Sequence, residues 1–155
     1  MSTAGRAEAE LIALAHHYAA AVDDLDTAAA AALFTDDGVL VSPRGDPFGE
    51  LVEHRGRAAI QAALDRVRAL DATFHAVVGS VVRLDLEAGT AVGRIACIAH
   101  HVSHRGDRIR DDVWHLHYLD DYRRSAQGWS ITRRELVVDL TTVTTEVGVR
   151  RRPAD

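Results

Sequence analysis

The feature that most constrains the fold is a change of hydrophobic period along the chain. Over residues 7–25 apolar side chains recur at spacings of three and four, the repeat of an amphipathic helix. From residue 73 onward the pattern is typical of strands separated by short turns. A chain with helices first and a run of strands afterwards folds as an α+β domain rather than as alternating βαβ units.

The first half predicts helices joined by polar segments. The helix over 7–25 should end at Asp23-Asp24-Leu25-Asp26, because aspartate favours turns and caps. Either Asp26 or Thr27 can then cap a short helix that runs to Phe34. Further segments are a turn at 35–38, a strand at 39–41, a loop at 42–56 that could cover a site, and a helix at 57–69.

The second half predicts four long strands near residues 73–86, 90–104, 109–124 and 128–140. Short turns join successive strands, so we expect an antiparallel meander. A sheet of this size must twist and curl. The sequence therefore predicts a curved, mostly antiparallel sheet that forms a cone, with N-terminal helices closing a pocket on its hollow side.

Composition limits the class of protein. The 155 residues fit a single domain, with a core at about 8–140 and a C-terminal extension at 141–155. A net charge of −5 argues against a nucleic-acid partner, and we expect the cluster Arg150–Arg152 to be a solvated tail. The sequence has no apolar run of about 20 residues, so we expect no membrane span. Cys97 is the single cysteine of the sequence, so an internal disulfide is excluded. Residues 1–10 do not resemble a secretion signal. Both observations favour a cytoplasmic location.

Several short motifs occur in an order that is similar to one known superfamily. They are Tyr18–Asp26 followed by Leu33–Gly38, Gly56–Ile60 at a helix start, Thr73-Phe74-His75, and Tyr118–Asp120 followed by Gly128–Arg134. Over residues 8–140 the chain resembles the SnoaL-like, nuclear-transport-factor-2-like cone superfamily. That superfamily includes scytalone dehydratase, ketosteroid isomerase and polyketide cyclases as well as non-enzymes, so the fold does not choose the function.

Within this superfamily the pattern is most similar to scytalone dehydratase. The resemblance implies that Asp23 and His75 are pocket residues and that a second pocket histidine is either His100 or His101. The polar pocket residue of the next strand falls at Tyr118. The dehydratase has a pocket tyrosine near the position of Ser42, so the substrate pocket differs and the same reaction is not implied.

Strand alternation helps to choose the residues that face the pocket. Residues 95, 97, 99 and 101 share one face, and Arg94 on the other face should point to solvent, which favours His101 over His100. On the next strand, Trp114, Leu116, Tyr118 and Asp120 share the face that we expect to be interior. His115 and His117 would then lie on the outer face, which in this superfamily often contacts a partner subunit, so we expect a homo-oligomer, a dimer or trimer.

These residues suggest acid–base chemistry. We expect Asp23, His75, His101 or His100, and Tyr118 to be catalytic, because an aspartate orients an imidazole that exchanges protons and a tyrosine donates to a carbonyl oxygen. Contacts to the substrate are expected from Tyr18, Phe34, Trp114, Leu116 and Asp120. This chemistry needs no cofactor, and no spacing of His, Cys and acidic residues predicts a metal site. In the alternative interpretation, His75 and His101 are core histidines and Asp23 caps a helix.

The function that fits best is a cofactor-independent enzyme of the dehydratase, isomerase or polyketide-cyclase type. Its substrate would be a small hydrophobic carbonyl or polyketide-like compound. One alternative is a non-catalytic domain that binds a small hydrophobic molecule. Another is the structural small subunit of a ring-hydroxylating oxygenase, which would fill the pocket with its own side chains.

Overall fold

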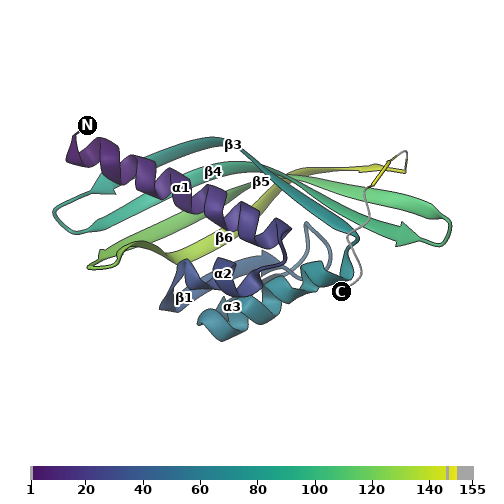
Figure 1. Ribbon diagram of the computed structural model, residues 1–155, viewed down its shortest axis with the longest axis horizontal. Helices are drawn as coiled ribbons and strands as arrows, with labels where there is room; N and C mark the ends of the chain where they lie inside the picture. Colours follow the sequence, from purple (N-terminus) through teal and green to yellow (C-terminus); the bar gives the residue numbers. More distant parts are fainter. Residues whose placement is uncertain (1, 146, 150–155) are drawn as a thin grey trace.

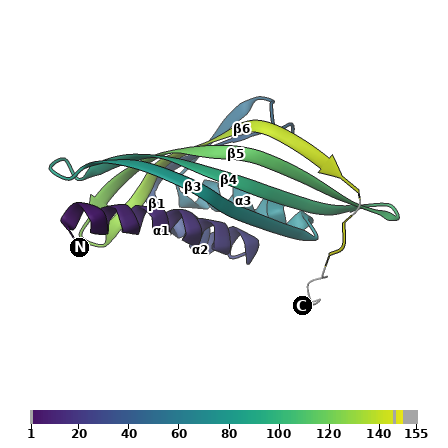
Figure 2. The same cartoon turned by 90° about the horizontal axis from the view of Figure 1, so that it is seen from above.

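The computed structural model describes residues 2–145 and 147–149, so Arg150–Arg152 lie outside the described residues. One curved sheet carries all the helices on one face (Figures 1 and 2). This α+β arrangement, with N-terminal helices over a mostly antiparallel sheet, is the predicted fold class. The elements are α1 (Thr3–Asp23), α2 (Thr27–Ala32), β1 (Phe34–Pro43), β2 (Leu51–Arg55), α3 (Arg57–Leu64), the 3₁₀ helix η1 (Asp65–Ala69), β3 (Ala72–Asp85), β4 (Thr90–Arg105), β5 (Arg108–Ser125) and β6 (Gly128–Thr144).

The strands of the described residues form one sheet in the order β2-β1-β6-β5-β4-β3. The four predicted long strands correspond to β3–β6 and pair antiparallel, whereas β1 joins the edge of β6 in parallel. Strand β6 extends four residues beyond the predicted end, because its last residues pair with β5 as far as Thr144 opposite Asp111. The first part of the predicted C-terminal extension therefore belongs to the sheet.

The prediction of a single loop over 42–56 is wrong. Strand β1 continues to Pro43 and pairs with β2 from Val39 opposite Arg55 to Pro43 opposite Leu51. This pairing satisfies backbone groups that a loop would leave to solvent. The predicted turn at 35–38 lies inside β1, where the register against β6 shifts between Phe34 and Val39.

The helices differ from the predictions at their ends. Helix α1 begins at Thr3 because the Ser2 hydroxyl accepts a hydrogen bond from the Gly5 amide at 3.1 Å, which caps it. It ends at Asp23, and Leu25 follows in the left-handed region at φ 61°. The predicted helix at 57–69 is α-helical only to Leu64 and continues as η1. Among the described residues, every helix is too short or too polar to cross a membrane.

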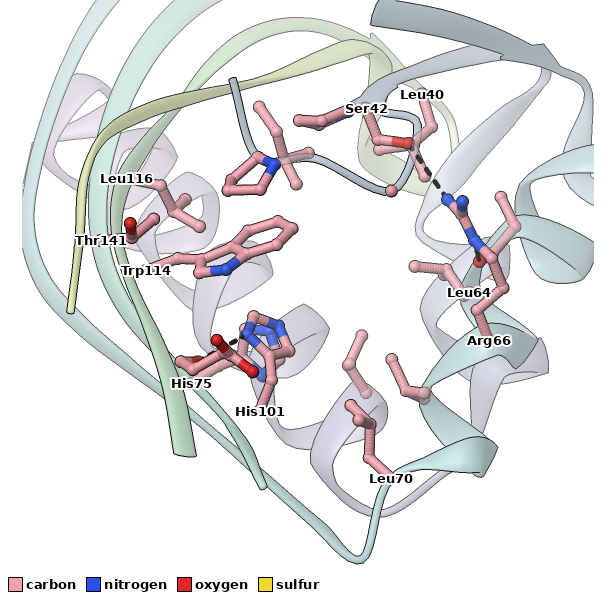
Figure 3. Close-up of a pocket in the computed structure, with 18 of the residues that line it drawn as sticks. Leu40, Ser42, Leu64, Arg66, Leu70, His75, His101, Trp114, Leu116 and Thr141 are labelled. Carbon is pink, nitrogen blue, oxygen red and sulfur yellow. Dashed lines mark hydrogen bonds between the residues drawn. The ribbon is translucent and has the colours of Figure 1, made fainter. Parts of the chain in front are cut away.

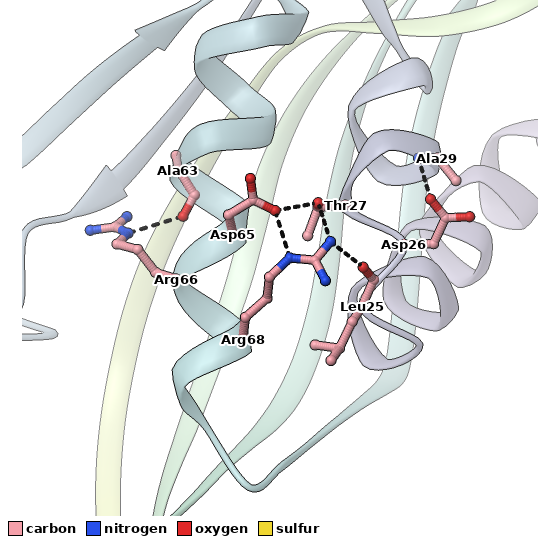
Figure 4. A network of polar contacts seen from close by, with 8 residues as sticks. All are labelled: Leu25, Asp26, Thr27, Ala29, Ala63, Asp65, Arg66 and Arg68. Atoms are coloured by element: carbon pink, nitrogen blue, oxygen red, sulfur yellow. Dashed lines mark hydrogen bonds and ion pairs between the residues drawn. The ribbon is translucent and has the colours of Figure 1, made fainter. Parts of the chain in front are cut away.

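A polar network fixes η1 against the start of α2 (Figure 4). The Thr27 hydroxyl donates to Asp65 Oδ1 at 2.5 Å, and Arg68 Nε donates to the same oxygen at 3.0 Å. The Arg68 guanidinium also donates to the Leu25 carbonyl oxygen at 2.9 Å. This network connects the segments on either side of β1 and β2, and so it holds η1 in place beside the sheet.

The core contains a fully buried cation, Arg134. Arg134 on β6 is 0% exposed and donates two hydrogen bonds to the buried Asp120 carboxylate, at 2.8 and 2.6 Å. The Tyr122 hydroxyl donates to the same carboxylate at 2.6 Å. The Arg134 guanidinium carbon lies 4.3 Å from the ring centre of Tyr18 and 4.2 Å from that of Tyr118, which places it in cation–π contact with both. This cluster joins α1 to strands β5 and β6 of the sheet.

Replacing Asp120 with Asn should lower the free energy of unfolding by about 3 kcal/mol or more, because it leaves the Arg134 charge buried without its counter-ion. Chemical denaturation monitored by circular dichroism measures this change. The matched control is Asp121→Asn on the exposed neighbouring residue, which should change stability by less than about 0.5 kcal/mol. Equal effects of the two substitutions would contradict the assignment of Asp120 as the essential counter-ion.

Candidate functional site

A cavity of about 550 Å³ lies between the concave face of the sheet and the helical segments. Its wall is largely apolar and includes Val22 from α1, Leu40 from β1, Leu64 from α3, and Trp114 and Leu116 from β5. A volume of this size accommodates a small organic molecule. Figure 3 shows His75, His101 and Trp114 on one side of the cavity, with Arg66 and Leu64 across from them.

The Asp23 carboxylate holds His75 by two hydrogen bonds. The backbone amide of His75 donates to Oδ2 at 2.8 Å, and the ring Nδ1 lies 2.7 Å from Oδ1. Burial raises the pKa of Asp23, but several lowering interactions, chiefly the hydrogen bonds and the charge of His75, together outweigh it, so the net shift is downward and the carboxylate stays ionised at neutral pH. Because a carboxylate only accepts, Nδ1 carries the proton when the ring is neutral. This leaves the Nε2 lone pair able to accept a proton.

His101 presents a second imidazole beside the first. The ring centres of His75 and His101 are 5.9 Å apart in an edge-on arrangement. The ring centre of Trp114 lies 4.7 Å from that of His101. His101 Nδ1 lies 3.1 Å from the backbone carbonyl oxygen of Asp112. A carbonyl oxygen only accepts, so His101 donates from Nδ1 and its Nε2 also carries a lone pair. Burial, and then the neighbouring His75, lower the pKa of His101, which keeps this ring neutral at neutral pH.

Two tyrosine rings from different elements contribute to the same cavity. Tyr18 comes from α1 and Tyr118 from β5, and their ring centres are 5.8 Å apart over Arg134. Burial raises the pKa of Tyr18 to about 12 and raises the pKa of Tyr118 well above its usual value. Both phenols therefore remain protonated, and each has an O–H that can act as a hydrogen-bond donor.

The structure brings most of the predicted site residues together. Six of them line the cavity, and Asp23 lies directly behind His75, to which it is bonded. The six are Tyr18, His75, His101, Trp114, Leu116 and Tyr118.

Three predicted residues, Phe34, His100 and Asp120, do not line this cavity. Phe34 is completely buried in the core, with its ring against Tyr18. His100 occupies the other strand parity from His101 and bonds instead to Asp111 Oδ2 at 2.7 Å. Asp120 is used as the counter-ion of Arg134.

Sequence reasoning missed the polar wall of the cavity opposite His75. This wall contains Arg66 from η1 and Ser42 from β1. Arg110 and Asp112 from β5 also line the cavity, and they form a bidentate ion pair at 2.8 and 2.6 Å. The assignment of 42–56 to a loop hid the inward position of Ser42. For Arg66 the sequence carried no distinguishing signal, because the same predicted helix also contains Arg57 and Arg68.

The described residues contain no group of three or more His, Cys, Asp or Glu side chains placed to bind a metal ion. Cys97 is buried in the core, and burial raises the pKa of its thiol to about 11, which disfavours the nucleophilic thiolate. What the arrangement can do chemically is move protons, through two imidazoles and two phenol donors in a largely apolar cavity.

The pKa of His101, measured by NMR titration of its ring protons, should lie below its ordinary value of 6.5. Replacing His75 with Gln should raise this pKa but leave it below 6.5, because burial is the larger cause and persists. Since folding depresses this pKa, protons bind preferentially to the unfolded chain, and His101 lowers stability as the pH falls below 6.5. His117→Gln on β5 is the control and should not move it. A pKa at or above 6.5 in the unaltered protein would contradict this picture.

Comparison with known proteins agrees with this architecture. A protein from Novosphingobium aromaticivorans that is provisionally named a scytalone dehydratase is 21% identical, with a TM-score of 0.73 over 93% of this chain and 89% of that one. ActVI-ORFA from Streptomyces coelicolor is 22% identical, with a TM-score of 0.66 over 85% and 97%. A type 2 hexachlorocyclohexane dehydrochlorinase, LinA, is 14% identical, with a TM-score of 0.75 over 92% of each chain.

Among curated proteins none matches the sequence significantly. The model of one family, the SnoaL-like domain, matches residues 4–135. This range covers α1 to the middle of β6, and it includes the cavity residues Tyr18, His75 and Tyr118. The chain therefore belongs to the SnoaL-like domain family.

Proposed function

We propose that this protein is a cofactor-independent acid–base enzyme of the dehydratase, isomerase or polyketide-cyclase type. Its substrate is a small hydrophobic carbonyl or polyketide-like compound. The observation that carries the proposal is the Asp23–His75 pair, in which a carboxylate 2.7 Å from Nδ1 fixes the imidazole at the wall of an apolar cavity. An imidazole held in this way is a general base with one defined accepting nitrogen.

In the proposed reaction, His75 Nε2 removes a proton from a carbon atom next to the substrate carbonyl. The electron pair moves onto the carbonyl oxygen, which becomes an enolate. Tyr118 donates a hydrogen bond to that oxygen from a phenol that burial keeps protonated. The proton then returns from the imidazolium to a different carbon, to a leaving hydroxyl group or to an oxygen formed by ring closure, which gives isomerisation, dehydration or cyclisation.

His101 assists this step in the proposal. Its ring lies beside that of His75, and its pKa is lowered by burial, so it is neutral when His75 becomes positively charged. A neutral second imidazole can accept or return a proton directly or through a water molecule. Two similar folds carry the names dehydrochlorinase and dehydratase, and both words denote eliminations. Elimination is thus one reaction that this fold accommodates.

The cavity also bears on the structural-subunit alternative. A purely structural subunit needs no open volume, and its core is expected to be filled by side chains. The open cavity of about 550 Å³, which His75 and His101 line, argues against that function. A binding domain without catalysis fits the cavity as well, and the following experiment separates it from the enzyme.

The first measurement is hydrogen–deuterium exchange at the carbon next to the carbonyl of 1-tetralone, an apolar bicyclic ketone. The ketone is incubated with the protein in D₂O buffer, and loss of the proton signal is followed by NMR. We expect exchange to be faster than in buffer alone. His75→Gln should reduce the protein-dependent rate by about a hundredfold or more, because the base is lost. Asp23→Asn should also reduce the rate, because the imidazole loses its orientation.

His117 and Asp139 provide a matched control, because they form the same kind of pair at 2.8 Å outside the cavity. His117→Gln and Asp139→Asn should leave the exchange rate unchanged. Exchange that is equally fast in His75→Gln would refute the proposed base. Binding of the ketone by calorimetry without any acceleration of exchange would support the binding-domain alternative.

A further inference from the structure

The wall of the cavity opposite His75 carries a cation that the proposed proton transfers do not use. Figure 3 shows Arg66 and Ser42 on this wall, across the open space from His75 and His101. Much of the remaining lining is apolar and includes Leu64, Trp114 and Leu116. The cavity therefore has a proton-transferring side and, across from it, a positively charged side.

The local structure of η1 turns Arg66 toward the cavity. Figure 4 shows Arg66 and Arg68 on different sides of this helix, with Arg68 bound to Asp65. Arg66 Nε donates to the Ala63 carbonyl oxygen at 3.0 Å, and this hydrogen bond orients the guanidinium group. Its Nη2 lies 3.4 Å from the Ser42 hydroxyl oxygen, and Ser42 is only 6% exposed. The charged group thus reaches an inner surface, although the residue as a whole is exposed.

The charge of Arg66 is not compensated within residues 2–145 and 147–149, where no carboxylate pairs with it. The other cavity arginine differs in this respect, because Arg110 is neutralised by the bidentate pair with Asp112. An arginine whose fork of donors is not occupied by a carboxylate can bind one.

The surroundings of Ser42 strengthen the positive potential at this end. The Ser42 hydroxyl is 3.4 Å from His54 Nε2 on β2. Burial lowers the pKa of His54, and the positive charges of Arg66 and Arg44 lower it further. The charged groups that act on His54 are therefore cations. A negatively charged ligand group placed here would be attracted by them and could accept hydrogen bonds from Arg66 and Ser42.

We propose that Arg66 and Ser42 bind a carboxylate group of the substrate at the end of the cavity opposite His75. This inference deepens the proposed function, on which it rests for the identity of the ligand as a substrate. A carboxylate fits better than a phosphate group, because beside Ser42 the cavity lining offers a single guanidinium, that of Arg66, whereas Arg44 does not line the cavity. The substrate class is then an apolar carbonyl compound with a carboxylate at the end remote from the reacting carbon.

Isothermal titration calorimetry with two probes of the same shape tests this assignment. The probes are 2-naphthoate, which carries the carboxylate, and 2-naphthamide, which is neutral. We expect naphthoate to bind on the order of tenfold more tightly, since hydrogen bonds to a charged group are the stronger kind. Arg66→Gln should abolish this preference, and Arg66→Lys should retain part of it. Arg94→Gln, the same change at an exposed arginine of β4 outside the cavity, should keep the preference intact.

Failure of the carboxylate site can be distinguished from failure of the proposed catalysis. His75→Gln should keep the preference for naphthoate, because the carboxylate site is at the other end of the cavity. Absence of ketone exchange by the unaltered protein, together with a clear preference for naphthoate, would therefore contradict only the proposed catalysis. Equal affinity for the two probes in the unaltered protein, a preference that persists in Arg66→Gln, or absence of binding by both probes would overturn the carboxylate site.

Discussion

The site depends on one carboxylate at the end of one helix. Asp23 is the last residue of α1, and it accepts hydrogen bonds from both the backbone amide and the ring of His75 on β3. The first bond joins the helix to the sheet, and the second selects the tautomer of the imidazole. The turn at Leu25, in the left-handed region, ends the helix directly after this contact. The same carboxylate therefore attaches α1 to the sheet and orients the proposed base.

Charges around the cavity fall into two classes with different consequences. Asp120 and Arg134 neutralise each other in the core, and their contribution is to hold Tyr18 and Tyr118 in place rather than to meet a ligand. Arg66 has no such counter-ion among the described residues and faces the open volume. An unpaired charge at a cavity wall needs solvent or a charged ligand group to stabilise it. A charge that is already paired in the core exerts little attraction on a ligand. This contrast supports assigning ligand recognition to Arg66.

Strand alternation allowed much of the fold and part of the site to be predicted, because one face of the long strands β4 and β5 is largely buried. It favoured His101 over His100, and it placed Tyr118 inside, where the structure also has it. The same rule assumes that arginine faces solvent, which holds for Arg94 but not for the fully buried Arg134. The partners of Arg134 come from α1 and β5, and contacts of this range leave no periodic signal. Ser42 was missed because prolines and glycines concealed the hairpin of β1 and β2.

The most direct test of this account is the tautomer of His75, observed through the ¹⁵N chemical shifts of its neutral ring in the unliganded protein. The account predicts a proton on Nδ1, shifted downfield by the hydrogen bond to Asp23, and an unprotonated Nε2. Asp23→Asn should weaken that downfield shift. A ring protonated only at Nε2 in the unaltered protein would contradict the claim that Asp23 prepares His75 to act as a base.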